Sequence, residues 1–223
     1  MPSLEREANR LRSLVDDADA IIVGIGSGMS SAAGFNHYNR AGMARARMED
    51  WQRSFGFKGL FDGFYHLYPS LEQQWAYYAR YIDFMLREPA SQPYLDLRAL
   101  IGHKDYFILS TNVDAQVEKT FPAERVCNYQ GSFARLQCKQ PCCDELFDAG
   151  PYVERMLAGM ARFEVRSEDV PVARTAAGSS CRGCATTRSC RARRGARASS
   201  DTSTSCASAA MAACFCWSSA WAR

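Results

Sequence analysis

The sequence has no long apolar run. None of its 223 residues lie in an apolar stretch of about 20, the length that a membrane-spanning helix needs. The charged opening segment, MPSLEREANRLRSLVDDADA, also lacks the apolar core of a secretory signal peptide. These absences argue against a membrane or secreted protein and predict a cytoplasmic one with no membrane partner. The hydrophobic fraction of 47% suffices for a buried core, so we expect a globular protein.

Acidic residues are scarce in the last quarter of the chain. Residues 173–223 contain eight Arg and a single Asp, a local charge of +7, whereas residues 1–172 carry −4. The overall charge of +3 therefore comes from the C-terminal segment. It gives no support for nucleic-acid binding by the rest of the chain.

The C-terminal segment, residues 172–223, also differs in composition. From residue 173 on, 38 of 51 residues are Ala, Ser, Arg or Cys, and no amphipathic period is present. Translation of G+C-rich DNA in a shifted frame gives such a mixture. Regrouping plausible codons from the third base of the Ala213 codon yields VLLLELGV, which is typical of a buried strand followed by a glycine turn. We therefore interpret this segment as an aberrant, out-of-frame and disordered tail, and expect the encoded chain to be truncated, unstable and inactive.

Buried strands and amphipathic helices alternate in the first part of the chain. The short apolar run from Ala20 to Val23 and the run from Tyr106 to Thr111 are typical of strands buried on both faces of a parallel sheet. Residues 4–17 have helical periodicity, and Ser70 with Gln73 forms a capping box before another helix. The alternation predicts an α/β domain with a parallel sheet.

Two polar motifs follow the predicted strands. Gly24-Ile25-Gly26-Ser27-Gly28 stands between strand and helix, where glycines let the backbone approach a phosphate. No acidic residue stands on a second strand about 20 positions later, so this is not an ordinary Rossmann site. Thr111-Asn112-Val113-Asp114 follows the second strand. Its Asn and Asp either bind a ligand at the sheet edge or cap the next helix.

A cysteine cluster lies farther along the chain. Cys138 and Cys142 or Cys143 have the spacing of half a tetrahedral zinc site, although ordinary cysteines would also account for them. Cys181 and Cys184 form a second pair, which the frame-shifted origin of the tail explains as a coincidence.

In their order, these motifs resemble those of the sirtuin (Sir2) family. The family's glycine motif is matched by Gly26-Ser27-Gly28-Met29-Ser30 with Gly34, its QNID by Thr111-Asn112-Val113-Asp114, and its HGS by Gln130-Gly131-Ser132. The resemblance implies a Rossmann-like NAD-binding domain over residues 1–126 with a helical insert at about 36–100. The start of a small zinc-binding module would follow over residues 127–171.

The resemblance also assigns roles to individual residues. It implies NAD as co-substrate, structural zinc on Cys138 and Cys142, and catalytic roles for Asn112, Asp114 and Gln130. The cofactor-binding residues that it implies are Gly26, Ser27, Gly28, Met29, Gly34, Phe35, Tyr38, Thr111, Asn112, Asp114 and Gln130.

The departures from the family pattern favour one activity. Gln130 replaces the usual catalytic His, and Asn36-His37-Tyr38-Asn39 replaces the PDFR segment. This pattern is similar to the macrodomain-linked bacterial sirtuins, which are associated with ADP-ribosylation of proteins, lipoyl-carrier proteins among them. Glutamine cannot accept a proton at neutral pH, whereas deacylation needs a base in its later step. We therefore expect transfer of ADP-ribose to a protein acceptor; the alternatives are deacylation with His37 as base and a non-catalytic NAD- or zinc-binding remnant.

Overall fold

The computed structural model describes residues 2–35, 43–138, 146–174, 180–182 and 184–186 of the chain. The helices are α1 (Pro2–Asp17), α2 (Ser27–Ala32), α3 (Met43–Phe55), α4 (Asp62–Tyr65), α5 (Leu71–Arg87), α6 (Gln92–Ile101), α7 (Gln116–Thr120) and α8 (Ala149–Ala158), with 3-10 turns η1 (Ala123–Arg125) and η2 (Ser167–Asp169). The strands are β1 (Ala20–Ile25), β2 (Asp105–Ser110), β3 (Val126–Asn128), β4 (Arg135–Cys138), β5 (Phe147–Asp148), β6 (Val172–Arg174), β7 (Ser180–Arg182) and β8 (Cys184–Thr186).

A parallel sheet in the order β1-β2-β3 confirms the predicted α/β class. The register pairs Ile25 with Ser110 at the end of β1, and Ser110 in turn with Asn128 at the end of β3. Because the strands are parallel, their carboxyl ends lie at one edge of the sheet. The chain segments that follow β1, β2 and β3 therefore start side by side.

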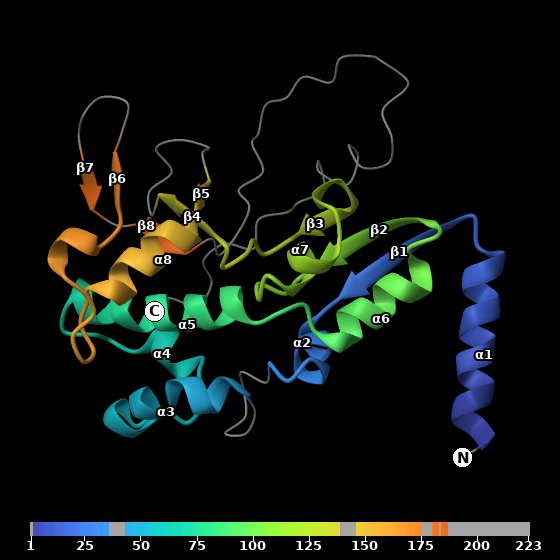
Figure 1. Cartoon of the computed structure of the whole chain (residues 1–223), viewed down its shortest axis with the longest axis horizontal. Helices are drawn as coiled ribbons and strands as arrows, with labels where there is room; N and C mark the ends of the chain where they lie inside the picture. The colour runs from blue at the N-terminus through green and yellow to red at the C-terminus, as the bar shows by residue number, and fades with distance from the viewer. Residues whose placement is uncertain (1, 36–42, 139–145, 175–179, 183, 187–223) are drawn as a thin grey trace, which may run out of the picture.

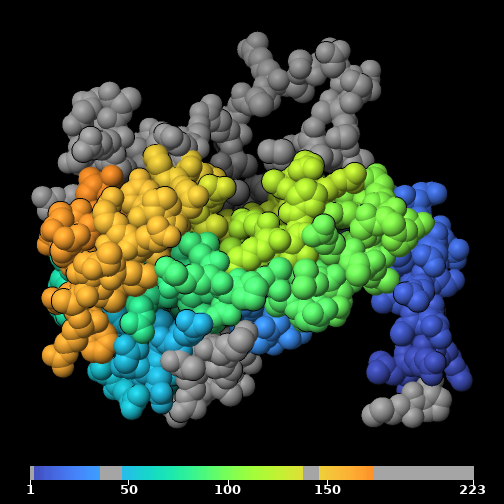
Figure 2. Space-filling view, in the orientation of Figure 1, coloured from blue at the N-terminus to red at the C-terminus, as the bar shows by residue number. Residues whose placement is uncertain are grey.

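Helices surround this sheet unevenly. α6 leads into β2 and α7 follows it, and the two helices contact one another. α1 stands apart from the body at the N-terminal end of the molecule, as Figures 1 and 2 show. It is held at its C-terminal end, where Lys104 Nζ donates hydrogen bonds to the carbonyl oxygens of Asp16 at 2.5 Å and Ala18 at 3.0 Å.

The insert between β1 and β2 is helical, as predicted, and its core is aromatic. α5 begins at the expected cap, where the Ser70 hydroxyl accepts from the Gln73 N–H at 3.2 Å. Trp51 of α3 is fully buried, with its ring centroid 5.3 Å from that of Tyr77 and 4.7 Å from that of Phe163. α8 lies along α5 and closes this layer (Figure 1). The aromatic residues of the insert thus serve as core packing.

Two further sheets, both antiparallel, contain the C-terminal strands. β4 pairs with β5 on one side and with β8 on the other, and its register places Cys138 opposite Cys184. β6 pairs with β7. β6, β7 and β8 contain the described residues of the segment that begins at 172. The rest of that segment lies outside the described ranges, and its out-of-frame origin stays a prediction, as do the domain boundaries.

One face of the parallel sheet is incompletely covered. Ile22 of β1 and Leu109 of β2 point to the same face and are 76% and 40% exposed. Leu11 and Leu14 of α1 are also exposed. Parallel sheets are normally covered on both faces, so these exposed side chains are unusual for such a sheet. Among the described residues no helix has the length and apolar character needed to cross a membrane.

Candidate functional site

The predicted motifs meet at the carboxyl edge of the parallel sheet. β1 continues into Gly26, β2 into Thr111 and β3 into Tyr129. The backbone N–H of Thr111 donates to the Ile25 carbonyl at 3.0 Å, and that of Tyr129 donates to the Ser110 carbonyl at 2.7 Å. The glycine motif, the Thr111–Asp114 motif and the loop that holds Gln130 are therefore adjacent in space, where open α/β sheets bind their ligands.

The glycine motif leaves open space around its backbone. Gly26 is extended, and its carbonyl accepts the Met29 N–H at 2.9 Å at the start of α2. A Cβ atom added at Gly28 would meet no protein atom within 4 Å, so protein packing does not explain this glycine. The first N–H groups of a helix have no partner within it. The backbone of Ser27 and Gly28 can therefore donate hydrogen bonds to a ligand oxygen.

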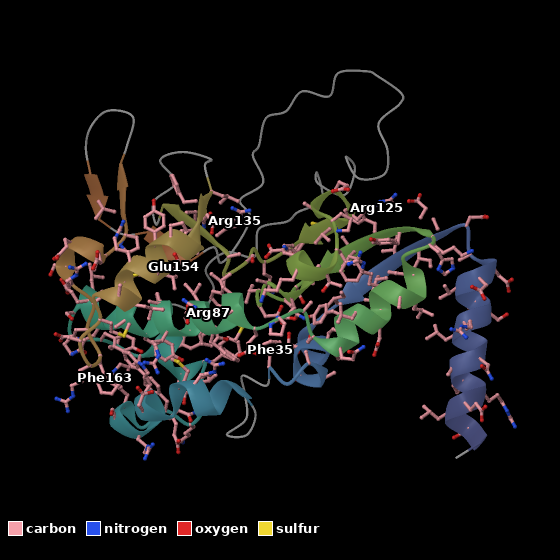
Figure 3. All side chains as sticks on the ribbon, in the orientation of Figure 1. Phe35, Arg87, Arg125, Arg135, Glu154 and Phe163 are labelled. Carbon is pink, nitrogen blue, oxygen red and sulfur yellow. The ribbon has the colours of Figure 1, made fainter. Side chains whose placement is uncertain are left out.

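The end of α2 explains two of the other predicted residues. Gly34 has a φ of 87°, a left-handed conformation that favours glycine. It turns the chain so that the Phe35 N–H donates to the Ser30 carbonyl at 2.8 Å. Phe35 is 1% exposed and its ring centroid lies 5.6 Å from that of Phe84, between α2 and α5 (Figure 3). Phe35 is thus part of the core, and its predicted contact with the cofactor is untested.

Asn112 is held by two hydrogen bonds from its side-chain nitrogen. Asn112 Nδ2 donates to the carbonyl oxygen of Gly26 at 2.9 Å and to the hydroxyl oxygen of Tyr94 at 3.1 Å. A carbonyl oxygen can only accept, so this orientation of the amide is required at Gly26. The amide therefore links the glycine motif directly to the segment that follows β2. This contact is what a single site formed by the two motifs requires.

Asp114 is a buried carboxylate with three donors around it. Its side chain accepts from the Ser30 hydroxyl at 2.5 Å and from the Gln116 N–H at 3.1 Å, and it lies 3.5 Å from the Tyr94 hydroxyl. The residue is 2% exposed. Burial, and secondarily the charge of Asp114, raises the pKa of Tyr94 to about 12. Tyr94 is therefore a neutral hydroxyl at ordinary pH, able to accept from Asn112 and donate towards Asp114.

The loop with Gln130 is fixed at both of its ends. Gln130 itself is exposed, and Gly131 has a φ of 82°. Glu118 of α7 accepts from Asn128 Nδ2 at 2.8 Å and from the Ser132 hydroxyl at 2.7 Å, on either side of the loop. The Gln130 side chain is thus presented to solvent from a loop whose two ends share one carboxylate.

Sequence reasoning missed Tyr94 and Glu118. Each lies on a helix without any recognisable motif. Tyr94 bonds to Asn112, and Glu118 bonds to both ends of the Gln130 loop. The sequence shows only the periodic apolar residues of these helices. This periodicity does not reveal which polar side chains face the sheet edge.

Several predicted residues lie outside the described residues. These are Tyr38, His37 and Cys142; Cys138 ends β4, but its side chain is not described. Within the described ranges, no group of three or more His, Cys, Asp or Glu side chains is arranged to hold a metal ion. The zinc prediction has therefore no support from the described side chains.

The fold and the arrangement of the site define a Rossmann-like α/β class. No protein-family model matches the chain. Over 173 residues the chain is 28% identical to a protein ADP-ribosyltransferase of Staphylococcus aureus (strain Mu50). The aligned region covers 77% of this chain and 54% of that protein. Over 147 residues it is 26% identical to a "Probable bifunctional ADP-ribose hydrolase/ADP-ribosyltransferase" of Fusarium oxysporum f. sp. cubense, covering 64% of this chain and 24% of that protein.

One solved structure gives the same fold. The ADP-ribose complex of a Ser-to-Ala mutant of a Sir2 homologue has a TM-score of 0.50 and 13% identity, over 83% of this chain and 64% of that one. The chain thus has the Sir2 type of Rossmann-like fold, which confirms the fold that the resemblance to the sirtuin family implies. It spans about half the length of the Staphylococcus relative and about a quarter of the Fusarium one.

Proposed function

We propose that the site at the carboxyl edge of the sheet binds NAD and transfers its ADP-ribose part to a protein acceptor. The observation that carries the proposal is the meeting of the glycine motif, Asn112 and the Gln130 loop at this edge. The names of the two sequence relatives, both of which include ADP-ribosyltransferase, support the same activity.

The residues at the edge suit a dinucleotide. The backbone of Ser27 and Gly28 would hold phosphate oxygens, because the space beside Gly28 is free of protein atoms. Asn112 would face the nicotinamide ribose, with its side-chain nitrogen already bonded to Gly26 and Tyr94. NAD, when bound, supplies a glycosidic bond whose cleavage releases nicotinamide. The protein's part is to orient the ribose and to stabilise positive charge there.

Gln130 favours transfer over deacylation. Its amide can donate and accept hydrogen bonds but cannot take up a proton at neutral pH. An enzyme without the general base that deacylation needs typically loses about 10²–10⁴-fold in rate. Transfer of ADP-ribose to a protein nucleophile needs no such later step on the ribose hydroxyl.

Nicotinamide release separates the candidate functions. The purified chain is incubated with NAD alone, with an acylated peptide, and with a lipoyl-carrier protein, the acceptor class that we propose. Transfer predicts nicotinamide release and a mass gain on the carrier protein, with no deacylated peptide. Release that depends on the acylated peptide would instead show a deacylase. Tight NAD binding without any release would show a non-catalytic remnant.

Asn112→Ala serves as the matched control in this assay. Any release that survives in the Asn112→Ala variant comes from a contaminant or from another site. Restoring the reading frame after Pro171 provides the second comparison, because it returns the residues that the proposed truncation removes.

We also propose structural zinc and a cytoplasmic location. The proposed ligands are Cys138 and Cys142, whose spacing is that of half a tetrahedral zinc site. Metal analysis of the purified protein tests this: about one zinc ion per chain, lost in both Cys138→Ser and Cys142→Ser, is the expected result. Zinc retained in Cys142→Ser would exclude Cys142 as a ligand.

A further inference from the structure

Tyr94 lies at the centre of the hydrogen bonds that join the parts of the site. It belongs to the first turn of α6, well before the Thr111–Asp114 motif in the sequence, and its side chain is 0% exposed. A buried tyrosine hydroxyl normally finds a partner, and this one faces two side chains of the site. It accepts from Asn112 Nδ2 at 3.1 Å and lies 3.5 Å from Asp114 Oδ2.

The Gly26 carbonyl and the Tyr94 hydroxyl together hold the Asn112 amide in one orientation. Both hydrogens of Asn112 Nδ2 are used, one by the Gly26 carbonyl and one by Tyr94. A flipped amide would place its oxygen against the Gly26 carbonyl oxygen, and two acceptors cannot bond. With the nitrogen turned inward, Asn112 Oδ1 is left over, and no described residue donates a hydrogen bond to it.

The same hydroxyl connects Asn112 to the buried carboxylate. Because Tyr94 accepts from Asn112, its own proton is free to point at Asp114, which Ser30 and the Gln116 N–H also approach. Hydrogen bonds arranged in a chain polarise one another. The negative charge of Asp114 thereby orients the Tyr94 hydroxyl, and this hydroxyl orients the amide.

We propose that Tyr94 is a positioning residue of the transferase site, which fixes Asn112 so that its Oδ1 faces the ligand. The expected effect on kinetics rests on the proposed NAD-dependent activity. The positioning of Asn112 rests only on the geometry of the free protein. Tyr94 makes no contact with the substrate in this account and acts only through Asn112.

The test compares Tyr94→Phe with Tyr77→Phe in the full chain. Both tyrosines are 0% exposed, and both hydroxyls are hydrogen-bonded; that of Tyr77 donates to the Leu60 carbonyl in the helical insert. Each variant loses one buried hydroxyl and should lose comparable stability. Only Tyr94→Phe should change the site.

The first readout is the Asn112 side-chain amide in the free protein. Selective 15N labelling of asparagine gives signals from the five Asn residues of the chain, and Asn112→Ala identifies the one in question. Tyr94→Phe should shift this signal and speed the exchange of its hydrogens with solvent, whereas Tyr77→Phe should leave it in place. An unchanged Asn112 signal in Tyr94→Phe would overturn the proposal.

The second readout is the division between binding and turnover. Tyr94→Phe should lower kcat for nicotinamide release about five- to tenfold, the effect of one hydrogen bond, with the NAD dissociation constant changed less than about twofold. An equal fall in kcat in Tyr77→Phe would show a merely structural role and would overturn the proposal. If the wild-type chain neither binds NAD nor releases nicotinamide, the proposed function fails, and the Asn112 signal still decides the role of Tyr94.

Discussion

The Gly28→Ala variant separates the stability of the protein from its binding of a nucleotide. Gly28 lies in the first turn of α2, and a methyl group added there would meet no protein atom within 4 Å. Alanine is favoured over glycine within a helix by up to about 1 kcal/mol, so the variant should be as stable as the wild type or slightly more stable.

Binding of NAD should respond in the opposite direction. If phosphate oxygens lie against the Ser27 and Gly28 backbone, the methyl group occupies their space and at least one charge-assisted hydrogen bond is lost. Such a bond contributes roughly 1.5–3 kcal/mol, so the dissociation constant for NAD should rise about 10- to 100-fold.

The assay combines calorimetric titration of NAD with urea unfolding followed by circular dichroism. Ser31→Ala is the matched control, because Ser31 lies on the same helix and its side chain is exposed. It should change neither quantity by a measurable amount. A Gly28→Ala variant that binds NAD as tightly as the wild type would refute the proposed phosphate contact, whatever its stability.

Three further predictions concern other parts of the chain. Gly63→Ala should destabilise the protein by about 1–3 kcal/mol in urea unfolding, because the added Cβ would lie only 2.1 Å from Tyr77 Cζ in the aromatic core. Adding Tyr77→Leu to this variant should recover part of that loss. The pKa of Tyr94 is raised to about 12 from its usual 10, so its contribution to stability should be complete below pH 10 and be lost as the pH rises from 10 to 12. The free energy of unfolding of Tyr94→Phe, measured against pH, should lack this loss. Identical curves for the variant and the wild type would contradict the prediction. Because the Ile22 side chain is 76% exposed, Ile22→Ser should change the unfolding free energy by less than about 0.5 kcal/mol and reduce self-association in analytical ultracentrifugation. A large destabilisation would show that this face of the parallel sheet is covered.

The sequence predicts the sheet and its motifs because both are local patterns. The apolar run Ala20–Val23 became the first part of β1, and the run from Tyr106 became β2, shifted by a single residue. Strands of a parallel sheet share one edge, so the motifs that follow them were expected to meet, and they do. By contrast, residues 40–68 have no clean helical period in the sequence, and α3, which lies within them, is kinked at Met48, where φ is −126°.

The contacts that fix the site could not be predicted from the sequence. Tyr94 reaches Asn112 across 18 positions and Asp114 across 20, and Glu118 holds Asn128 and Ser132. In the sequence Tyr94 looks like any aromatic residue at a buried helical position, because periodicity indicates burial and not the partner of a hydroxyl group. Such pairings depend on how α6 and α7 lie against the sheet, which is a property of the whole fold.

The distribution of tryptophan gives the two layers of the molecule different optical signals. Of the four tryptophans, Trp51 and Trp75 lie in the helical layer, and Trp217 and Trp221 are outside the described ranges. The parallel sheet and its edge contain tyrosines, such as Tyr94 and Tyr106, but none of the described tryptophans. Emission of Trp51 and Trp75 therefore follows the melting of the aromatic insert. A loss of nucleotide binding that precedes the change in this emission would mean that the sheet edge loosens while the helical layer remains intact.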